Sequence, residues 1–274
     1  MRQMAGRAST FFPIARLLLQ AVGVVLALIA SNLSQATPSA AILVYHRFGP
    51  QVADSMTTRT EVFIAQLAEL HRAGYTIVPL ATVVDGLAGH VPLPPKAVAI
   101  TVDDGHRTVY SDLLPIIRRE QLPVTLFIYP SAISNASYAM SWAQLQELLA
   151  TGSVSIQSHT YWHPDLRIER RRLDADAYRR FVHDQLEKPR RVLRYRLGVD
   201  ADYLAWPFGI HDAELEAAAK TVGYRAAFTL GERHATPHDS PFALPRYLIV
   251  DGRGVSGLIH SLQAGERSAA GALP

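Results

Sequence analysis

Short apolar segments alternate with helical patterns along most of this sequence, and that alternation restricts the fold more than any other feature. The segments 41–48 ("AILVYHRF") and 95–104 ("PKAVAITVDD") are apolar and rich in β-branched residues, which is typical of buried strands. Between them, segment 60–74 repeats apolar residues at helical spacing and ends on Gly74. Strands that alternate with helices predict an α/β fold with a mainly parallel sheet.

The same alternation continues to the end of the chain. Further strands are predicted over 75–80, 123–130, 154–160, 203–209, 224–230 and 243–250, and further helices over 110–121 (with a kink at Pro115), 141–152, 212–223 and 255–263. About seven such units in one domain predict an incomplete, deformed (β/α) barrel.

The first 36 residues are expected to direct export. Arg2, Arg7 and Arg16 precede the uncharged apolar run 17–30, and small residues follow two positions apart. A basic start, a short apolar middle and a small-x-small site make up a secretory signal peptide. The run is shorter than the ~20 residues that span a membrane. We predict that residues 1–36 are a signal peptide or an uncleaved anchor, and that the protein contacts a membrane only if this segment stays attached. The protein is then expected to be exported to the periplasm, the cell envelope or the medium.

Charge and cysteine content exclude two classes of function. The chain has 27 Lys and Arg residues against 24 Asp and Glu residues, a net charge of +3. Three arginines and no acid lie within 1–36, so the remainder is balanced and no nucleic-acid partner is expected. The chain has no cysteine, which excludes disulfides and thiolate metal sites. We predict a single domain over 41–263 and a disordered tail over 264–274.

The residues that follow the predicted strands form an unusual set. In a parallel α/β barrel, functional groups lie at the carboxyl ends of the strands. Those ends hold His46, Asp103-Asp104, His159 to His163, Pro207-Phe208-Gly209 and Arg246. The residues after a strand are ordinarily turn residues. Here they include three histidines and two aspartates, whose imidazoles and carboxylates are metal ligands.

The two histidines of "SHTYWHPDL" strengthen the case for a metal. His159 and His163 are four residues apart, so one helical turn would bring both imidazoles to the same side. Two histidines and one carboxylate form a facial set of ligands that leaves positions open for water and substrate. Such a pair also occurs on surfaces and in loops, but together with the two aspartates it predicts a metal site.

Three motifs in this order resemble those of a known family. "TVDDG", "SHTYWH" and "WPFG" are similar to the T-F-D-D-G, H-[ST]-x-x-H and R-x-P-[YF] motifs of the polysaccharide deacetylases of carbohydrate esterase family 4, the NodB-homology domains. The resemblance covers residues 41 to about 250. It implies an incomplete barrel, a divalent metal that is usually Zn²⁺, and hydrolysis of acetyl groups on sugars.

The resemblance also implies a role for each motif residue. Asp104, His159 and His163 would hold the metal, and Asp103 would act as the base. The backbone N–H of Phe208 would donate to the oxyanion of the tetrahedral intermediate.

Two departures from the family pattern point to one branch of it. Ala205 stands where the third motif normally has its arginine. The family also has a histidine late in its sequence, in an L-x-H motif, that acts as the general acid. "LIH" at 258–260 matches these letters but lies in a predicted helix after the last strand, so we do not assign it that role. The opening "LVYHRF" resembles a circularly permuted branch that includes exported deacetylases of poly-N-acetylglucosamine. In that branch His46 would be the general acid, and Arg246 would steady Asp103.

Several functions stay open from the sequence alone. The expected activity is removal of N-acetyl groups from an exported or cell-envelope polysaccharide. The motif order favours poly-β-1,6-N-acetylglucosamine as the substrate, and a polysaccharide synthesis and export complex is a candidate partner. Alternatives are deacetylation of peptidoglycan, chitin-like or O-acetylated glycans, amide hydrolysis of a small molecule, or a catalytically silent member that only binds glycan or acts as a scaffold of a synthase complex. A silent member would have lost a site residue, and none is missing.

Overall fold

One parallel sheet forms the centre of the protein. The structure, a computed structural model, describes residues 37–271. Within that range, eight strands form one sheet in the order β10-β1-β5-β6-β7-β8-β9, with β4 paired to the start of β5. Every one of these pairs is parallel, as predicted. The strands are β1 (Ala40–Tyr45), β4 (Thr76–Ile77), β5 (Ala97–Asp103), β6 (Val124–Ile128), β7 (Val154–Ser158), β8 (Tyr203–Ala205), β9 (Ala226–Phe228) and β10 (Tyr247–Leu248).

The sheet curls into an incomplete barrel, which confirms the predicted fold. At one end of the strand order, β10 pairs with β1. Just before β10, Leu244 forms a single parallel bridge to Phe228 of β9, at the other end of the order. The gap between β9 and β10, which we call the seam, is therefore crossed by an irregular segment rather than by a continuous ladder of strand hydrogen bonds.

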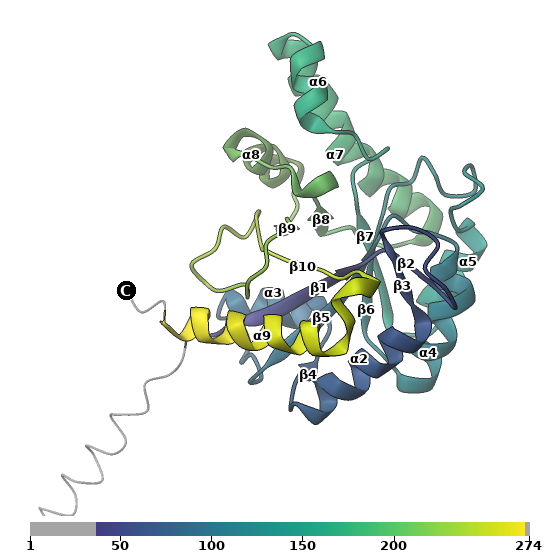
Figure 1. Cartoon of the computed structure of the whole chain (residues 1–274). Coiled ribbons are helices and arrows are strands. Elements are labelled where there is room, and N and C mark those ends of the chain that lie inside the picture. The colour runs from purple at the N-terminus through teal and green to yellow at the C-terminus, as the bar shows by residue number, and fades with distance from the viewer. Residues whose placement is uncertain (1–36, 272–274) are drawn as a thin grey trace, which may run out of the picture. The chain divides into compact units, whose positions relative to one another are not determined.

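Helices cover the outside of the sheet (Figure 1). They are α2 (Thr60–Arg72), α3 (Leu80–Leu87), α4 (Leu114–Glu120), α5 (Trp142–Leu149), α6 (Leu166–Arg172), α7 (Ala175–Leu197), α8 (Ala213–Val222) and α9 (Gly254–Gly271), with short turns η1 (Val109–Leu113), η2 (Pro207–Gly209) and η3 (Asp251–Arg253) and a separate ribbon of β2 (Arg47–Gly49) and β3 (Thr57–Arg59). All residues of β1, β5 and β6 are buried. Burial on both faces explains why these strands are mainly apolar.

Local signals in the sequence set several helix ends. Ser141 and Gln144 form a capping box at the start of α5, and Asp212 caps α8, which ends at Gly223 in the left-handed conformation. The predicted kink near Pro115 is a π-helical turn, η1, that leads into α4. Pro115 lies in the first turn of α4, where its missing N–H costs no helical hydrogen bond.

Two expectations about the last part of the chain differ from the structure, and one about its start is not tested. The predicted strand 243–250 is regular only over Tyr247–Leu248, because the segment before it crosses the seam. The predicted disordered tail is wrong over 264–271, where α9 continues to Gly271 and buries Ala269. The predicted signal peptide over 1–36 lies outside the described residues. Among the described helices, none combines the length and apolar character needed to cross a membrane.

Candidate active site

Side chains from the carboxyl ends of several strands line one pocket. Parallel strands end at the same edge of a sheet, so residues far apart in sequence meet there. The pocket has a volume of about 220 Å³ and is lined by His46, Met56, Asp103, Asp104, His159, His163, Trp206, Phe208, Gly209, Leu230, Arg246 and Leu248. All seven residues to which the family resemblance assigns a role are in this set.

The backbone at the end of β5 separates the two adjacent aspartates. Asp103 is the last residue of β5, and Asp104 has a φ of 73°, in the left-handed region. Gly105 follows with a φ of 71°, and a Cβ there would lie 3.1 Å from side-chain atoms of Ile128 and Ile133. The strand thus turns sharply at Asp104, which lets neighbouring carboxylates face different partners.

Asp103 is buried and paired with Arg246. The two guanidinium nitrogens of Arg246 donate to the two carboxylate oxygens of Asp103 at 2.8 and 2.7 Å. Arg246 is itself only 1% exposed and also donates to the hydroxyl of Thr101. Burial is the largest single influence and raises the pKa of Asp103, but the charge of Arg246, the neighbouring His159 and the hydrogen bonds from Arg246 together outweigh it and lower the pKa to about 2. Asp103 is therefore ionised at every ordinary pH.

His159 and His163 meet through a loop rather than through a helical turn. The segment between β7 and α6 is irregular, and both Thr160 and His163 have left-handed backbones, with φ values of 64° and 62°. The backbone N–H of His163 donates to the hydroxyl of Thr160, which stabilises the turn. The predicted proximity of the two imidazoles is present, with their ring centroids 4.6 Å apart, but its predicted helical cause is wrong.

The three residues Asp104, His159 and His163 have the donor set of a metal site. Asp104 Oδ1 lies 3.7 Å from Nε2 of each histidine, and the three potential ligand atoms are within 4.8 Å of one another. A tetrahedral zinc site separates adjacent ligand atoms by about 3.4 Å, given bonds of about 2.1 Å. The observed spacing therefore suits one divalent ion.

The protonation of the histidines also suits metal binding. Nδ1 of His159 lies 2.8 Å from the carbonyl oxygen of Ala205, so Nδ1–H donates to it and Nε2 is the nitrogen that faces Asp104. Burial and the nearby charge of His159 lower the pKa of His163 to about 4. His163 is therefore neutral at neutral pH, and neutral imidazole is the form that coordinates metals.

His46 and Phe208 complete the polar part of the pocket. His46 follows β1, and its Nδ1 atom is buried with no hydrogen-bond partner in the described part of the chain. Burial lowers the pKa of His46, although Asp103 and Asp104 oppose that effect. Phe208 lies in the turn η2 after β8 with a left-handed φ of 57°. His260, by contrast, lies exposed on α9 and does not line the pocket.

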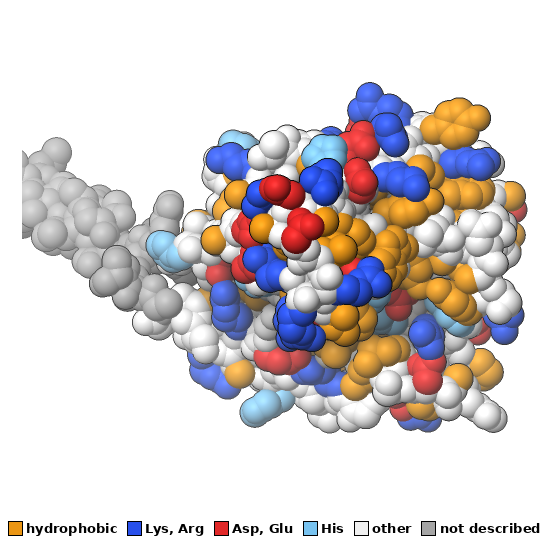
Figure 2. Space-filling view, turned by 90° about the horizontal axis from the view of Figure 1, so that it is seen from above, with side chains coloured by type: hydrophobic (Ala, Val, Ile, Leu, Met, Phe, Trp, Pro, Cys, Tyr) orange, Lys and Arg blue, Asp and Glu red, His pale blue; other side chains and the backbone are white. Residues whose placement is uncertain are grey.

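Sequence reasoning missed the apolar lining of the pocket. Met56 comes from the segment before β3, Leu230 comes from the loop after β9, and Leu248 is the last residue of β10. Viewed from above, hydrophobic side chains gather over the middle of the molecule's face (Figure 2). No motif marks these positions, because any apolar side chain of suitable size could fill them.

The comparison with protein families finds one matching model. A model described as "Polysaccharide deacetylase" matches residues 90–227. That range includes both aspartates, both histidines and Phe208 of the pocket.

Curated relatives match over part of their length. The poly-β-1,6-N-acetyl-D-glucosamine N-deacetylase of Escherichia coli K12 is 26% identical over 245 residues, which covers 76% of this chain and 36% of that protein. The enzyme of the same name from Staphylococcus epidermidis is 26% identical over 160 residues, which covers 57% of this chain and 55% of that protein. The chain thus spans about a third to about a half of the length of these relatives.

Solved structures share the architecture. IcaB from Ammonifex degensii has a TM-score of 0.70 at 26% identity, covering 81% of this chain and 96% of that one. The Streptococcus pyogenes deacetylase PplD in complex with acetate has a TM-score of 0.73 at 19% identity, covering 82% of this chain and 99% of that one, which shows the shared fold. With the matched model covering half of the chain, and with the motif residues gathered in one pocket, this chain belongs to the polysaccharide deacetylase family.

Proposed function

We propose that this protein is a metal-dependent hydrolase that removes N-acetyl groups from an exported polysaccharide. The observation that carries the proposal is the meeting of Asp104, His159 and His163 around one point, with the ionised Asp103 beside them. Hydrolysis of an acetamide needs an activated water and a base to take its proton, and both requirements can be met at this point.

The metal site would consist of Asp104, His159 and His163. Two imidazole nitrogens and one carboxylate oxygen suit Zn²⁺, which we propose as the native ion. When bound, such an ion polarises the acetyl carbonyl and lowers the pKa of a water ligand. The hydrogen bond from His159 to Ala205 fixes the ring in the required tautomer.

Asp103 is proposed as the general base. Its carboxylate lies 3.7 Å from His159 Nε2, so it sits beside the ligands, and Arg246 keeps it ionised. A strongly paired carboxylate is a weak base, and Asp103 would accept the proton of the attacking water. Arg246 acts as a positioning residue, because it fixes both oxygens of Asp103.

His46 and the backbone of Phe208 are proposed to serve the later steps. His46 lines the same pocket and would give a proton to the amine as the carbon–nitrogen bond breaks. The backbone N–H of Phe208 would donate a hydrogen bond to the oxyanion of the tetrahedral intermediate. Both groups come from strand ends, which are rigid supports for such contacts.

The proposed substrate is poly-β-1,6-N-acetylglucosamine or a similar N-acetylated polymer. Support comes from the two curated relatives, which carry that substrate in their names. Deacetylation exposes amines and makes a neutral polymer cationic, which favours adhesion to anionic surfaces. We further propose that residues 1–36 direct export, that the catalytic domain spans 41–263, and that the protein works beside a polysaccharide synthesis and export complex.

Acetate release from a panel of glycans tests this proposal. The panel should hold β-1,6-linked N-acetylglucosamine oligomers, chitin oligomers, peptidoglycan and O-acetylated xylan, each assayed with and without added Zn²⁺. We expect metal-dependent release from the β-1,6-linked oligomers. Release only from xylan or peptidoglycan would contradict the substrate, and no release from any member would contradict the activity.

A further inference from the structure

His163 is the most weakly fixed of the proposed metal ligands. Its side chain is 21% exposed, whereas that of His159 is 2% exposed and is anchored to the carbonyl of Ala205. Within residues 37–271, no hydrogen bond joins the His163 ring to another residue. Imidazole ligands ordinarily donate their second nitrogen to a fixed acceptor, which sets the direction of the ring. Something else must hold this ring in place.

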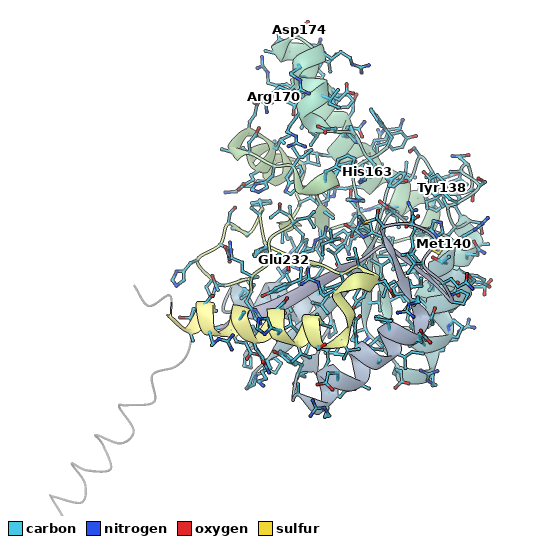
Figure 3. All side chains as sticks on the ribbon, in the orientation of Figure 1. Tyr138, Met140, His163, Arg170, Asp174 and Glu232 are labelled. Carbon is cyan, nitrogen blue, oxygen red and sulfur yellow. The ribbon has the colours of Figure 1, made fainter. Side chains whose placement is uncertain are left out.

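Aromatic rings take that place around His163. The ring of Phe208 packs edge to face on it, with centroids 4.7 Å apart and planes at 68°. The ring of Tyr129 lies on it at 5.3 Å and 45°. Both separations are in the range of favourable aromatic pairs, which prefer tilted over face-to-face geometry. Figure 3 labels His163 at the upper edge of the sheet.

The second ring, Tyr129, is itself held by a hydrogen bond. Tyr129 follows β6 directly, and its hydroxyl lies 2.7 Å from the hydroxyl of Tyr138. This hydrogen bond restricts the ring of Tyr129, which packs against the imidazole of His163.

Phe208 has no role in the core that would explain its side chain. Its side chain is 58% exposed, so burial contributes little to the fold. Its left-handed backbone, with a φ of 57°, is an unfavourable conformation for a residue with a Cβ. The oxyanion role proposed above uses only its backbone N–H, which almost any residue would supply. The contact with His163 is what remains to account for an aromatic side chain here.

We propose that the Phe208 side chain is a positioning residue that, together with Tyr129, holds the His163 imidazole in its ligating orientation. This inference rests on the proposed metal-dependent function. The rings hold Nε2 of His163 toward Asp104 Oδ1, 3.7 Å away, and so replace the missing hydrogen-bonded anchor. Without the Phe208 ring, His163 rotates toward solvent and the ion loses one ligand for part of the time.

Metal titration of the full chain tests the proposal without relying on activity. The affinity for Zn²⁺ is measured by competition with a chelating dye, and Co²⁺ serves as a spectroscopic probe of coordination. Phe208→Ala is expected to lower the Zn²⁺ affinity about tenfold and to weaken the Co²⁺ absorption band, since loss of a residue that orients a ligand typically costs ~10–100-fold. Phe208→Tyr keeps a ring and is expected to stay within about twofold of the wild-type affinity.

Two further variants separate positioning from general effects on the pocket. Leu230→Ala removes another partly exposed apolar side chain, 39% exposed, from the same pocket and should leave the Zn²⁺ affinity within about twofold. Tyr129→Ala should weaken binding in the same direction as Phe208→Ala, whereas Tyr129→Phe keeps the ring and should not. If Phe208→Ala fails to fold by circular dichroism, Phe208→Leu replaces it, with the same expected loss.

The outcomes distinguish this inference from the proposed function. Wild-type affinity in Phe208→Ala and Tyr129→Ala would overturn the positioning role while leaving the metal site intact. At saturating Zn²⁺, Phe208→Ala should recover most of its kcat with little change in KM, whereas a large KM defect would mean that the ring contacts substrate instead. A wild-type chain that binds no divalent ion would refute the proposed function itself.

Discussion

Replacement of Arg246 by methionine should expose how strongly the buried ion pair is coupled. Methionine fills much of the space of the arginine stem but leaves the Asp103 carboxylate without its two guanidinium hydrogen bonds. Asp103 is 2% exposed, so water cannot replace those bonds without rearrangement. The variant therefore carries an uncompensated buried charge, or protonates the carboxyl to avoid one.

Two routes give the magnitude of the effect. The pKa of Asp103 falls from an ordinary 3.8 to about 2 in the folded state, which corresponds to about 2–3 kcal/mol of folding free energy at ~1.36 kcal/mol per pKa unit. Breaking a buried pair by removing one partner typically costs ~3–5 kcal/mol. We expect Arg246→Met to lose about 3 kcal/mol, or about 6–12 °C in Tm for a domain of this size.

The pH dependence has a defined sign. Because the folded pKa of Asp103 is depressed, its stabilising contribution is present above the unfolded pKa of about 4 and is lost as the pH falls toward about 2. Arg246→Met removes the main charge that opposes the effect of burial, so the pKa of Asp103 rises relative to the wild type. The activity of the variant should therefore rise with increasing pH, as Asp103 loses its proton. The activity of the wild type should show no such rise over the same pH range.

A double-mutant cycle in urea measures the coupling. Asp103→Asn leaves Arg246 buried without its carboxylate, and the double variant removes both charges. The double variant should lose about 2 kcal/mol less unfolding free energy than the two single variants lose in sum. The reason is that replacing both partners of a buried pair is often nearly neutral. Losses that add within about 0.5 kcal/mol would refute the reasoning.

Three further predictions concern catalysis and folding. Asp103→Asn should retain its bound metal yet lose ~10²–10⁴-fold in kcat, measured as acetate release; a near wild-type rate would remove Asp103 from the mechanism. His46→Ala should lose most activity, whereas His260→Ala, exposed on α9, should stay close to the wild type; the reverse result would exclude the role of His46. Ser141→Ala breaks the capping box of α5 and should lower the free energy of unfolding by ~1 kcal/mol, seen as a lower urea midpoint, while the rate per folded molecule is unchanged.

Strand ends could be predicted from the sequence because parallel sheets bring them to one edge. Asp103 ends and His46 follows a buried, mainly apolar strand, so their shared location needed only the α/β pattern. The pairing of Arg246 with Asp103 could be anticipated only from the family resemblance. The residues are 143 positions apart, and no local signal connects them.

The remaining features depend on tertiary contacts. The left-handed turns at Thr160 and His163 follow from contacts of the loop rather than from residue type, so a helical turn was the wrong expectation. The aromatic contact of Tyr129 with His163 joins a strand end to that loop and has no signature in sequence. The tail was misjudged because its buried face consists partly of small residues, such as Gly265 and Ala269, which give a weak hydrophobic pattern.

Metal content of the purified protein tests the central claim most directly. Elemental analysis by inductively coupled plasma mass spectrometry should find about one divalent ion per wild-type chain, because three ligand atoms meet within 4.8 Å of one another. Asp104→Ala and His159→Ala each remove one ligand and should lose most of that ion, together with activity. Full occupancy in both variants would contradict the proposed site.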